Sequence, residues 1–177
     1  VEDVNKNIKI LLKKIFPYPP LNSIGITGTN GKTSVVWFIS QICELNKKSI
    51  KTYGTLGYYK NGKKVKDSNL TTPEYEILYQ SAFLKKKNLF NFAFEVSSHS
   101  LYQNRIENFP INIAAITNIS HDHLDFHKTM KNYRNKKYKL FLKYLLNKGT
   151  AVLNDNIDDI DRLKKQLEKK NIKIITY

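Results

Sequence analysis

The chain has 177 residues, 41% of them hydrophobic, which is enough to bury the core of one domain, or of one domain with a fragment of another. Its net charge is +15, and its single cysteine, Cys43, excludes an internal disulfide. No apolar run approaches the roughly 18 residues that a membrane helix needs, and the N-terminus has no signal-peptide pattern. We therefore expect a cytoplasmic protein that has no membrane partner.

The positive charge has two interpretations. One is a polyanionic partner such as nucleic acid. The other is a lysine-rich solvated surface, which we favour because arginine occurs only at Arg105, Arg134 and Arg162 and lysine is spread evenly. Proteins that bind nucleic acids usually concentrate arginine and aromatic residues on one face. We expect no nucleic-acid partner, although a basic pocket would suit acidic small substrates such as nucleotides.

Apolar periodicity predicts strands that alternate with helices. A first helix lies within residues 1–20 and ends in a proline-rich stretch, which indicates a linker into a new domain that covers residues 21–177. The later elements are predicted as strand 23–27, helix 33–45, strand segment 49–59, strand 63–66, helix 73 to about 87, strands 89–96 and 111–118, helix 130–146, strand 150–154, helix 157–170 and strand 172–176. This order favours an α/β fold, with a mostly parallel sheet and helices on both faces. No helix follows the last strand, so we expect the domain to be incomplete.

The segment TGTNGKT, between the first predicted strand and the helix after it, has the composition of a phosphate-binding loop. Gly28 and Gly31 allow backbone N–H groups to converge on one anion, and the helix adds the positive end of its dipole. Lys32 can reach the β and γ phosphates, and Thr33 can place its hydroxyl on Mg²⁺. The strict pattern is not met, because Ile26 stands at its first glycine. The alternative, a chance turn before a helix, is disfavoured by the strand and helix on either side.

Two further polar segments follow predicted strands. Glu95 ends one strand and His123 follows another, so both could converge on the phosphate loop at the carboxyl edge of the sheet. A carboxylate at this edge often holds Mg²⁺, and a surface salt bridge is the alternative role of Glu95. His121, His123 and His127 could suggest zinc, but we favour a structural role for His121 and His127. Lys137, by composition alone, is one more solvated lysine.

Several motifs in this order resemble the central ATPase domain of the Mur ligases, a P-loop NTPase-like domain. They are GITGTNGKT from Gly25, TTP from Thr71, EVSSHSL from Glu95, QNR from Gln103 and TNISHDHLDFH from Thr117. The resemblance runs from about residue 20 to the end. The glutamate and histidine segments match the branch of the family that adds a diamino acid to UDP-MurNAc-L-Ala-D-Glu. Folylpolyglutamate synthases share the ATP loop but vary elsewhere.

The resemblance implies a ligase of peptidoglycan precursor synthesis that uses ATP and Mg²⁺. The substrate carboxylate attacks the γ phosphate to give an acyl phosphate and ADP, and the amine of a diamino acid then forms the amide. Meso-diaminopimelate is the commoner diamino acid, and lysine is the alternative. Lys32 and two Mg²⁺ ions would reduce the repulsion between the two anions.

The resemblance also assigns roles to residues of this chain. The catalytic residues would be Lys32, Glu95, His123 and Lys137. The ATP phosphates would lie against Gly28, Thr29, Asn30, Gly31, Lys32, Thr33 and Ser34. The UDP-MurNAc-dipeptide would contact Thr71, Thr72, Ser97, Gln103 and Arg105. The metal ligands would be Thr33, Glu95, His123 and Lys137, the last as an anionic carbamate after carbamylation.

The chain departs from the family pattern in two ways. Ser100 stands where many relatives have glycine. The chain is also short, so we expect the C-terminal domain to be absent and the uridine-binding N-terminal domain to be absent except for its end and linker in residues 1–20. We expect this segment alone, a monomer, not to complete the reaction. Two alternatives stay open: another Mur or folylpolyglutamate-type ligase, and a basic nucleotide-binding module without catalysis.

Overall fold

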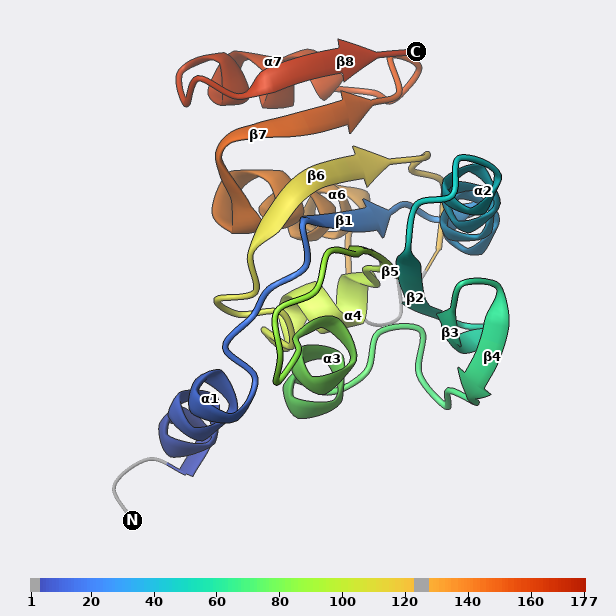
Figure 1. The fold of residues 1–177 in the computed structure, drawn as a ribbon. Helices are drawn as coiled ribbons and strands as arrows, with labels where there is room; N and C mark the ends of the chain where they lie inside the picture. Colours follow the sequence, from blue (N-terminus) through green and yellow to red (C-terminus); the bar gives the residue numbers. More distant parts are fainter. Residues whose placement is uncertain (1–3, 123–127) are drawn as a thin grey trace.

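The structure is a computed structural model that describes residues 4–122 and 128–177 (Figure 1). Its helices are α1 Val4–Ile15, α2 Lys32–Leu45, α3 Tyr75–Ala82, α4 Ser98–Tyr102, α6 Met130–Lys139, the π-helix η1 Leu140–Tyr144 and α7 Ile160–Glu168. Its strands are β1 Asn22–Thr27, β2 Ile50–Gly54, β3 Gly57–Lys60, β4 Lys63–Lys66, β5 Asn91–Glu95, β6 Ile111–Ile116, β7 Leu145–Leu153 and β8 Lys173–Thr176. Among these residues, no helix is long and apolar enough to cross a membrane.

The strands form one sheet in the order β4-β3-β2-β5-β1-β6-β7-β8. All neighbours from β2 to β8 pair in parallel, and β3 and β4 add an antiparallel hairpin at one edge. Ile26 of β1 pairs with Glu95 of β5, and Thr27 pairs with Ile116 of β6. The three central strands therefore end level with one another, which brings the loops after them to one place.

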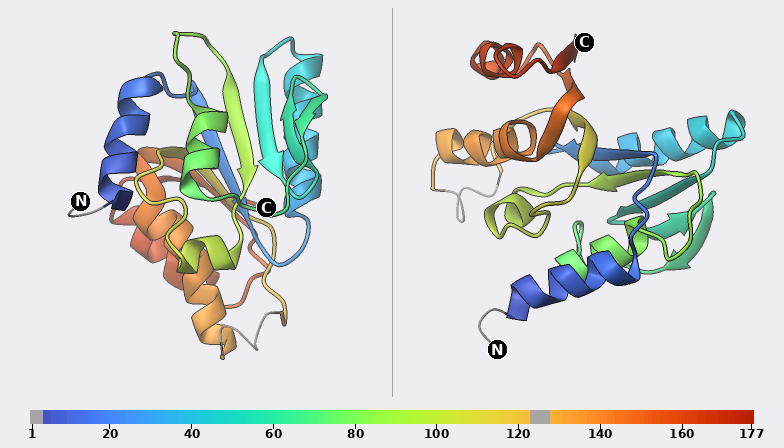
Figure 2. Two further views of the ribbon diagram at one scale, coloured as in Figure 1. Left: turned by 90° about the horizontal axis from the view of Figure 1, so that it is seen from below. Right: turned by 60° about the vertical axis from the view of Figure 1, so that its left-hand side comes forward.

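Helices cover both faces of the sheet. Helix α2 packs on β1, β2 and β5, around a small core that includes Ile26, Val36 and Ile50. The other face carries α1, α3, α4, α6, η1 and α7, over a larger core in which Phe92 and Phe94 are fully buried (Figures 1 and 2). The predicted fold class, a mostly parallel α/β sheet with helices on both faces, is confirmed.

Three local predictions need correction, and one helix was missed. The segment 49–59 is not one strand, because the chain reverses after β2 and returns as β3. Helix α3 ends at Ala82 instead of near residue 87, because Phe83 is extended and Leu84 forms a bridge with Tyr18. The predicted helix 130–146 changes to a π-helix at Leu140 and gives way to β7 at residue 145. The short helix α4 was not predicted.

Candidate active site

The phosphate loop, residues 27–33, joins β1 to α2, as the sequence predicts. Gly28 has φ 144° and Gly31 has φ 81°, backbone conformations that disfavour side chains. A Cβ on Gly28 would lie 1.8 Å from Oγ1 of Thr117, so this glycine is also needed for close approach. Lys32 Nζ donates to the carbonyls of Gly28 at 2.9 Å and Thr29 at 2.8 Å. Burial lowers the pKa of Lys32, an effect that the nearby carboxylates only partly oppose.

The loop after β6 holds the phosphate loop from the side. Thr29 N donates to the Asn118 carbonyl at 2.9 Å, and Asn30 N donates to Asn118 Oδ1 at 3.0 Å. Thr117 Oγ1 donates to the carbonyl of Asn30 at 2.6 Å. The side chains of Asn30 and Ser34 are exposed. Thr117 and Asn118, which the resemblance matched as motif residues, therefore fix the shape of the phosphate loop.

Glu95 ends β5 beside the phosphate loop, and its residue is only 1% exposed. Oε2 accepts from the Thr33 hydroxyl at 3.0 Å, and Oε1 accepts from the backbone N–H of Thr55 at 2.7 Å. The Thr55 hydroxyl lies 3.3 Å from Oε2. The alternative role as a surface salt bridge is therefore wrong. The hydroxyl of Thr33 and the carboxylate of Glu95 are oxygen donors of the kind that Mg²⁺ prefers.

Sequence reasoning missed Gly54 and Thr55, which touch Glu95 from the neighbouring strand. An alanine Cβ at Gly54 would lie 2.1 Å from Glu95 Oε1, so the close approach of the carboxylate requires glycine here. In the sequence both residues lie inside the segment 49–59 that was predicted as one strand, so nothing local marked them as site residues. Strand pairing was needed to place them opposite Glu95.

Lys137 lies in α6 and is 1% exposed, so its interpretation as a solvated lysine is wrong. Its Nζ donates to the carbonyl of Gly28 at 2.8 Å and lies 4.4 Å from the centre of the Tyr133 ring. Burial, then the charge of Lys32, lowers the pKa of Lys137 to about 7, and Asp122 opposes this shift. Helix α6 therefore places the amine of Lys137 against the backbone of the phosphate loop.

The predicted substrate residues lie on the other side of Glu95. Thr72 Oγ1 donates to the backbone carbonyl of Glu95 at 2.8 Å and accepts from the N–H of Ser97 at 2.9 Å. Arg105 Nη1 donates to the carbonyl of Thr72 at 2.9 Å. The Ser97 hydroxyl accepts from the N–H of Ser100 at 3.1 Å and so caps α4. The Ser100 hydroxyl is buried and donates to the Ser97 carbonyl at 2.8 Å, so a serine fits the fold at this position.

A cavity of about 290 Å³ joins two residues of the phosphate loop, Gly28 and Lys32, to the predicted substrate residues. It is lined by Gly28, Lys32, Leu70, Thr71, Thr72, Ser97, Ser98, His99, Gln103, Arg105, Tyr133 and Lys137. All five predicted substrate residues are in this lining. Thr33 and Glu95 line a second, small cavity with Gly54. The structure thus gathers the predicted groups at one edge of the sheet, while their roles stay predictions.

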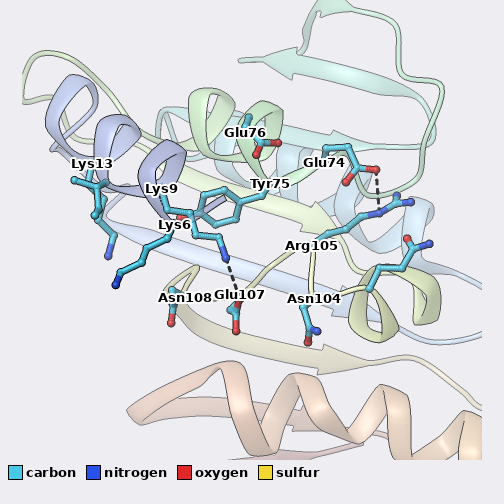
Figure 3. Close-up of a pocket in the computed structure, with 12 residues that line it drawn as sticks. Lys6, Lys9, Lys13, Glu74, Tyr75, Glu76, Asn104, Arg105, Glu107 and Asn108 are labelled. Atoms are coloured by element: carbon cyan, nitrogen blue, oxygen red, sulfur yellow. Dashed lines mark hydrogen bonds and ion pairs between the residues drawn. The ribbon is translucent and has the colours of Figure 1, made fainter. Parts of the chain in front are cut away.

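A larger cavity of about 700 Å³ lies between α1, the start of α3 and residues 103–108 (Figure 3). Gln103 and Arg105 line both cavities. The charged residues in Figure 3 are partly paired, since Lys9 contacts Glu107 at 2.8 Å and Arg105 Nε lies 3.2 Å from Glu74. The two cavities therefore meet at the segment that carries Arg105.

The structure describes only one of the three histidines that follow β6. His123 and His127 lie outside the described residues, and the role of His123 stays a prediction. His121 is exposed. Within residues 4–122 and 128–177, no three His, Cys, Asp or Glu side chains form a group that could hold a metal ion.

Comparisons with known proteins identify the family and agree with the fold. Residues 26–177 match the family model of the Mur ligase middle domain. The chain is 40% identical over 180 residues to the UDP-N-acetylmuramoyl-L-alanyl-D-glutamate--2,6-diaminopimelate ligase of Rickettsia prowazekii, covering 99% of this chain and 38% of that protein. A solved structure of a ligase of the same name superimposes with a TM-score of 0.78 at 30% identity, over 96% of this chain and 34% of that one.

A more distant structure shares the fold alone. Folylpolyglutamate synthetase of Helicobacter pylori superimposes with a TM-score of 0.68 at 15% identity, over 96% of this chain and 47% of that one. The chain spans less than two fifths of the length of the Rickettsia relative. Since the family model covers most of this chain, the chain belongs to the Mur ligase family, and residues 26–177 match the middle domain of that family.

Proposed function

We propose that the complete protein is an ATP-dependent ligase that joins a diamino acid, meso-diaminopimelate, to UDP-MurNAc-L-Ala-D-Glu. The observation that carries this proposal is the convergence of Lys32, Glu95 and Lys137 at one edge of the sheet, beside a cavity lined by all the predicted substrate residues. The names of the relatives support the choice of substrates.

The residues present fit a nucleotide and Mg²⁺. The loop from Gly28 to Ser34 would receive the phosphates at the N-terminus of α2. Thr33 and Glu95 would hold the metal, because their oxygens already lie 3.0 Å apart. When bound, Mg²⁺ would offset the negative charge of the phosphates.

Lys32 is the group of this chain that faces the developing charge. The reaction brings the substrate carboxylate to the γ phosphate, and two anions repel each other. The Lys32 ammonium, held at the mouth of the loop by two carbonyls, can move onto the phosphate oxygens as they arrive. It would stabilise the transferring group while the substrate carboxylate, held near Thr72 and Arg105, attacks in line.

Lys137 is proposed to act as a carbamate. With a pKa of about 7, a large fraction of its buried amine is neutral near neutral pH, and the neutral amine is a nucleophile. Its nitrogen would attack CO₂ and lose one proton, which leaves an anionic carbamate. That group carries oxygen atoms suited to a hard cation. Intact-mass measurement in bicarbonate buffer tests this step, and a bare amine at saturating bicarbonate would contradict it.

The remaining parts of the function belong to the complete protein. Its other segments would bind the uridine group and the diamino acid, and we place the protein in the cytoplasm as a monomer. The described residues would contribute the phosphate loop and the cavity of about 290 Å³ that the predicted substrate residues line.

The decisive experiment uses the complete purified protein with ATP, Mg²⁺, UDP-MurNAc-L-Ala-D-Glu and meso-diaminopimelate. We expect phosphate release that depends on both substrates, and a tripeptide product by mass spectrometry. Lys32→Ala should abolish both, and Lys63→Ala, on the exposed hairpin strand β4, should change neither. Turnover with lysine, the monopeptide or a folate instead would identify another ligase. Salt-sensitive nucleic-acid binding that survives Lys32→Ala, without turnover, would favour a non-catalytic module.

A further inference from the structure

The carboxylate of Glu95 is held by a strand that the proposed mechanism does not use. Strand β2 runs parallel to β5, and Tyr53 pairs with Phe94, so Gly54 lies beside Glu95. Gly54 does not have a positive φ, so its backbone would accept a side chain. The space would not, because a Cβ there would lie 2.1 Å from Oε1 and 2.8 Å from the carboxyl carbon. Gly54 therefore admits the carboxylate to its position.

Thr55, the next residue, binds that carboxylate. Its N–H donates to Oε1 at 2.7 Å, and its hydroxyl lies 3.3 Å from Oε2. The only other donor to this carboxylate among the described residues is the hydroxyl of Thr33. If the Thr33 oxygen turned to a metal ion, its hydrogen bond to Glu95 would be lost. Thr55 would then be the residue that keeps the carboxylate in place.

Thr55 also touches the proposed substrate segment. Its Oγ1 lies 3.3 Å from Oγ1 of Thr71, and the next residue, Thr72, donates to the backbone carbonyl of Glu95. A single hydroxyl proton on Thr55 can serve either Glu95 or Thr71, but not both at once. A ligand that takes up the lone pairs of the Thr71 hydroxyl would direct the Thr55 proton to Glu95.

We propose that Gly54 and Thr55 form a carboxylate cradle that orients Glu95 toward the metal. In addition, Thr55 couples the substrate segment at Thr71 to that carboxylate. Both are positioning residues, since neither has to touch the reacting atoms. The inference rests on the magnesium and nucleotide site of the proposed function, and it adds a way for substrate binding to strengthen metal binding.

The test measures Mn²⁺ affinity of the complete protein in the presence of ADP, by the electron paramagnetic resonance signal of free Mn²⁺. Thr55→Val removes the hydroxyl and keeps the N–H, and we expect about tenfold weaker Mn²⁺ binding, the lower end of the effect of groups that orient a metal ligand. Thr55→Ser should restore most of the affinity. Thr176→Val, the same exchange at an exposed position of β8, is the matched control and should bind as the wild type does.

Gly54→Ala should weaken Mn²⁺ binding more than Thr55→Val, because it displaces the whole carboxylate. Circular dichroism and thermal melting establish that each variant is folded. If Gly54→Ala does not fold, the comparison of Thr55→Val with Thr55→Ser still decides the proposal, because Thr55 is exposed and its exchange leaves the core intact. Equal Mn²⁺ affinity in Thr55→Val and the wild type, or a Thr55→Ser variant as weak as Thr55→Val, would overturn the cradle.

The coupling is tested by adding UDP-MurNAc-L-Ala-D-Glu. We expect it to tighten Mn²⁺ binding in the wild type and not in Thr55→Val or Thr71→Val, and we expect the double variant to match the single ones. Additive effects, or tightening that survives both exchanges, would overturn the coupling. A wild type that binds Mn²⁺ and ADP but forms no tripeptide would contradict the proposed function and leave the cradle supported. A wild type that binds neither would overturn both.

Discussion

Two buried charged residues flank the phosphate loop, and the fold treats them differently. Glu95 and Lys137 are each 1% exposed. The carboxylate of Glu95 accepts hydrogen bonds from Thr33 and Thr55, and thus has its charge spread over several donors. Among residues 4–122 and 128–177, the ammonium of Lys137 has one backbone carbonyl and the face of one aromatic ring as partners, and the charge of Lys32 disfavours the ammonium further.

The difference indicates that the two groups are prepared for different tasks. A buried carboxylate with matched donors is held in one position, as the proposed metal ligand should be. A buried amine with few acceptors is stabilised in its neutral form, which is the form that reacts with CO₂. The Glu95 side of the site is therefore complete as folded, whereas the Lys137 side would be completed by modification.

The largest expected effect comes from Glu95→Gln, which keeps the shape and removes the charge. The amide nitrogen would face at least one donor, so we expect the free energy of unfolding to fall by about 1–3 kcal/mol. Phosphate release by the complete protein should fall on the order of 100-fold or more, because a charge fixed at the phosphate site is lost. Glu168→Gln, on the exposed side of α7, is the control and should change neither. A stable and active Glu95→Gln variant would contradict the role of the carboxylate.

Lys137→Met should act in the opposite direction on stability. In bicarbonate-free buffer, removing the buried ammonium should raise the free energy of unfolding on the order of 1 kcal/mol, because its desolvation cost disappears. Activity in bicarbonate should nevertheless fall by roughly 10- to 100-fold, the range for loss of a group that supports a metal site. Denaturant unfolding and phosphate release measure the two effects. Lys131→Met, on the exposed side of α6, is the matched control. A destabilised Lys137→Met variant would show that the ammonium contributes to the fold.

Lys51 is a buried lysine outside the candidate active site, with 8% of its surface exposed. It therefore shows what burial alone does to a lysine, apart from any role in catalysis. Its Nζ donates to the Ser81 carbonyl at 3.2 Å and lies 4.4 Å from the centre of the Phe90 ring. Burial, then Lys60, lowers its pKa from 10.5 to about 8. Between these two values the unfolded chain binds the additional proton, so this group makes stability rise as pH increases from about 8 to 10.5.

Lys51→Met should remove that rise in stability. Activity near neutral pH should stay within about twofold of the wild type, because Lys51 contacts none of the described residues of the candidate active site. The difference between variant and wild type in unfolding free energy, measured from pH 7 to 11, isolates Lys51 from the other lysines. Parallel pH profiles for the two proteins would show that Lys51 titrates as an ordinary exposed lysine.

The phosphate loop and the parallel sheet could be predicted because their signals are local. The glycines at 28 and 31, the β-branched residues of β1 and the apolar spacing of α2 each lie within one segment. The turn at Asn61 and Gly62, between β3 and β4, has a signal that is equally local, since asparagine followed by glycine is common in hairpin turns and both residues have positive φ. The end of α3 was not, because the bridge between Leu84 and Tyr18 joins distant parts of the chain.

The missed parts of the site depend on contacts between distant segments. The burial of Lys137 arises because α6 packs against a loop more than 100 residues earlier, and lysines 136 and 137 look the same in sequence. Gly54 and Thr55 gain their role only when β2 pairs with β5. Family resemblance pointed to Lys137, but it gave no reason for the choice. The structure gives a reason, because the amine of Lys137 is buried and contacts few polar groups in the part of the chain that the structure describes.

The smallest expected effect comes from Thr129→Ala, which tests whether the Glu95 side of the site depends on the Lys137 side. Thr129 is the N-cap of α6, and its hydroxyl accepts from the N–H of Asn132 at 3.2 Å. Thr129→Ala should lower the free energy of unfolding by about 1 kcal/mol, and Thr129→Ser should restore it. Because α6 carries Tyr133 and Lys137 but not Glu95, we expect carbamylation of Lys137 to fall slightly and Mn²⁺ binding with ADP in bicarbonate-free buffer to stay unchanged. Urea denaturation, intact mass and Mn²⁺ titration measure the three quantities. If Thr129→Ala weakened Mn²⁺ binding as much as Thr55→Val, the Glu95 side would depend on α6, and the two buried charges would have to be treated as one unit.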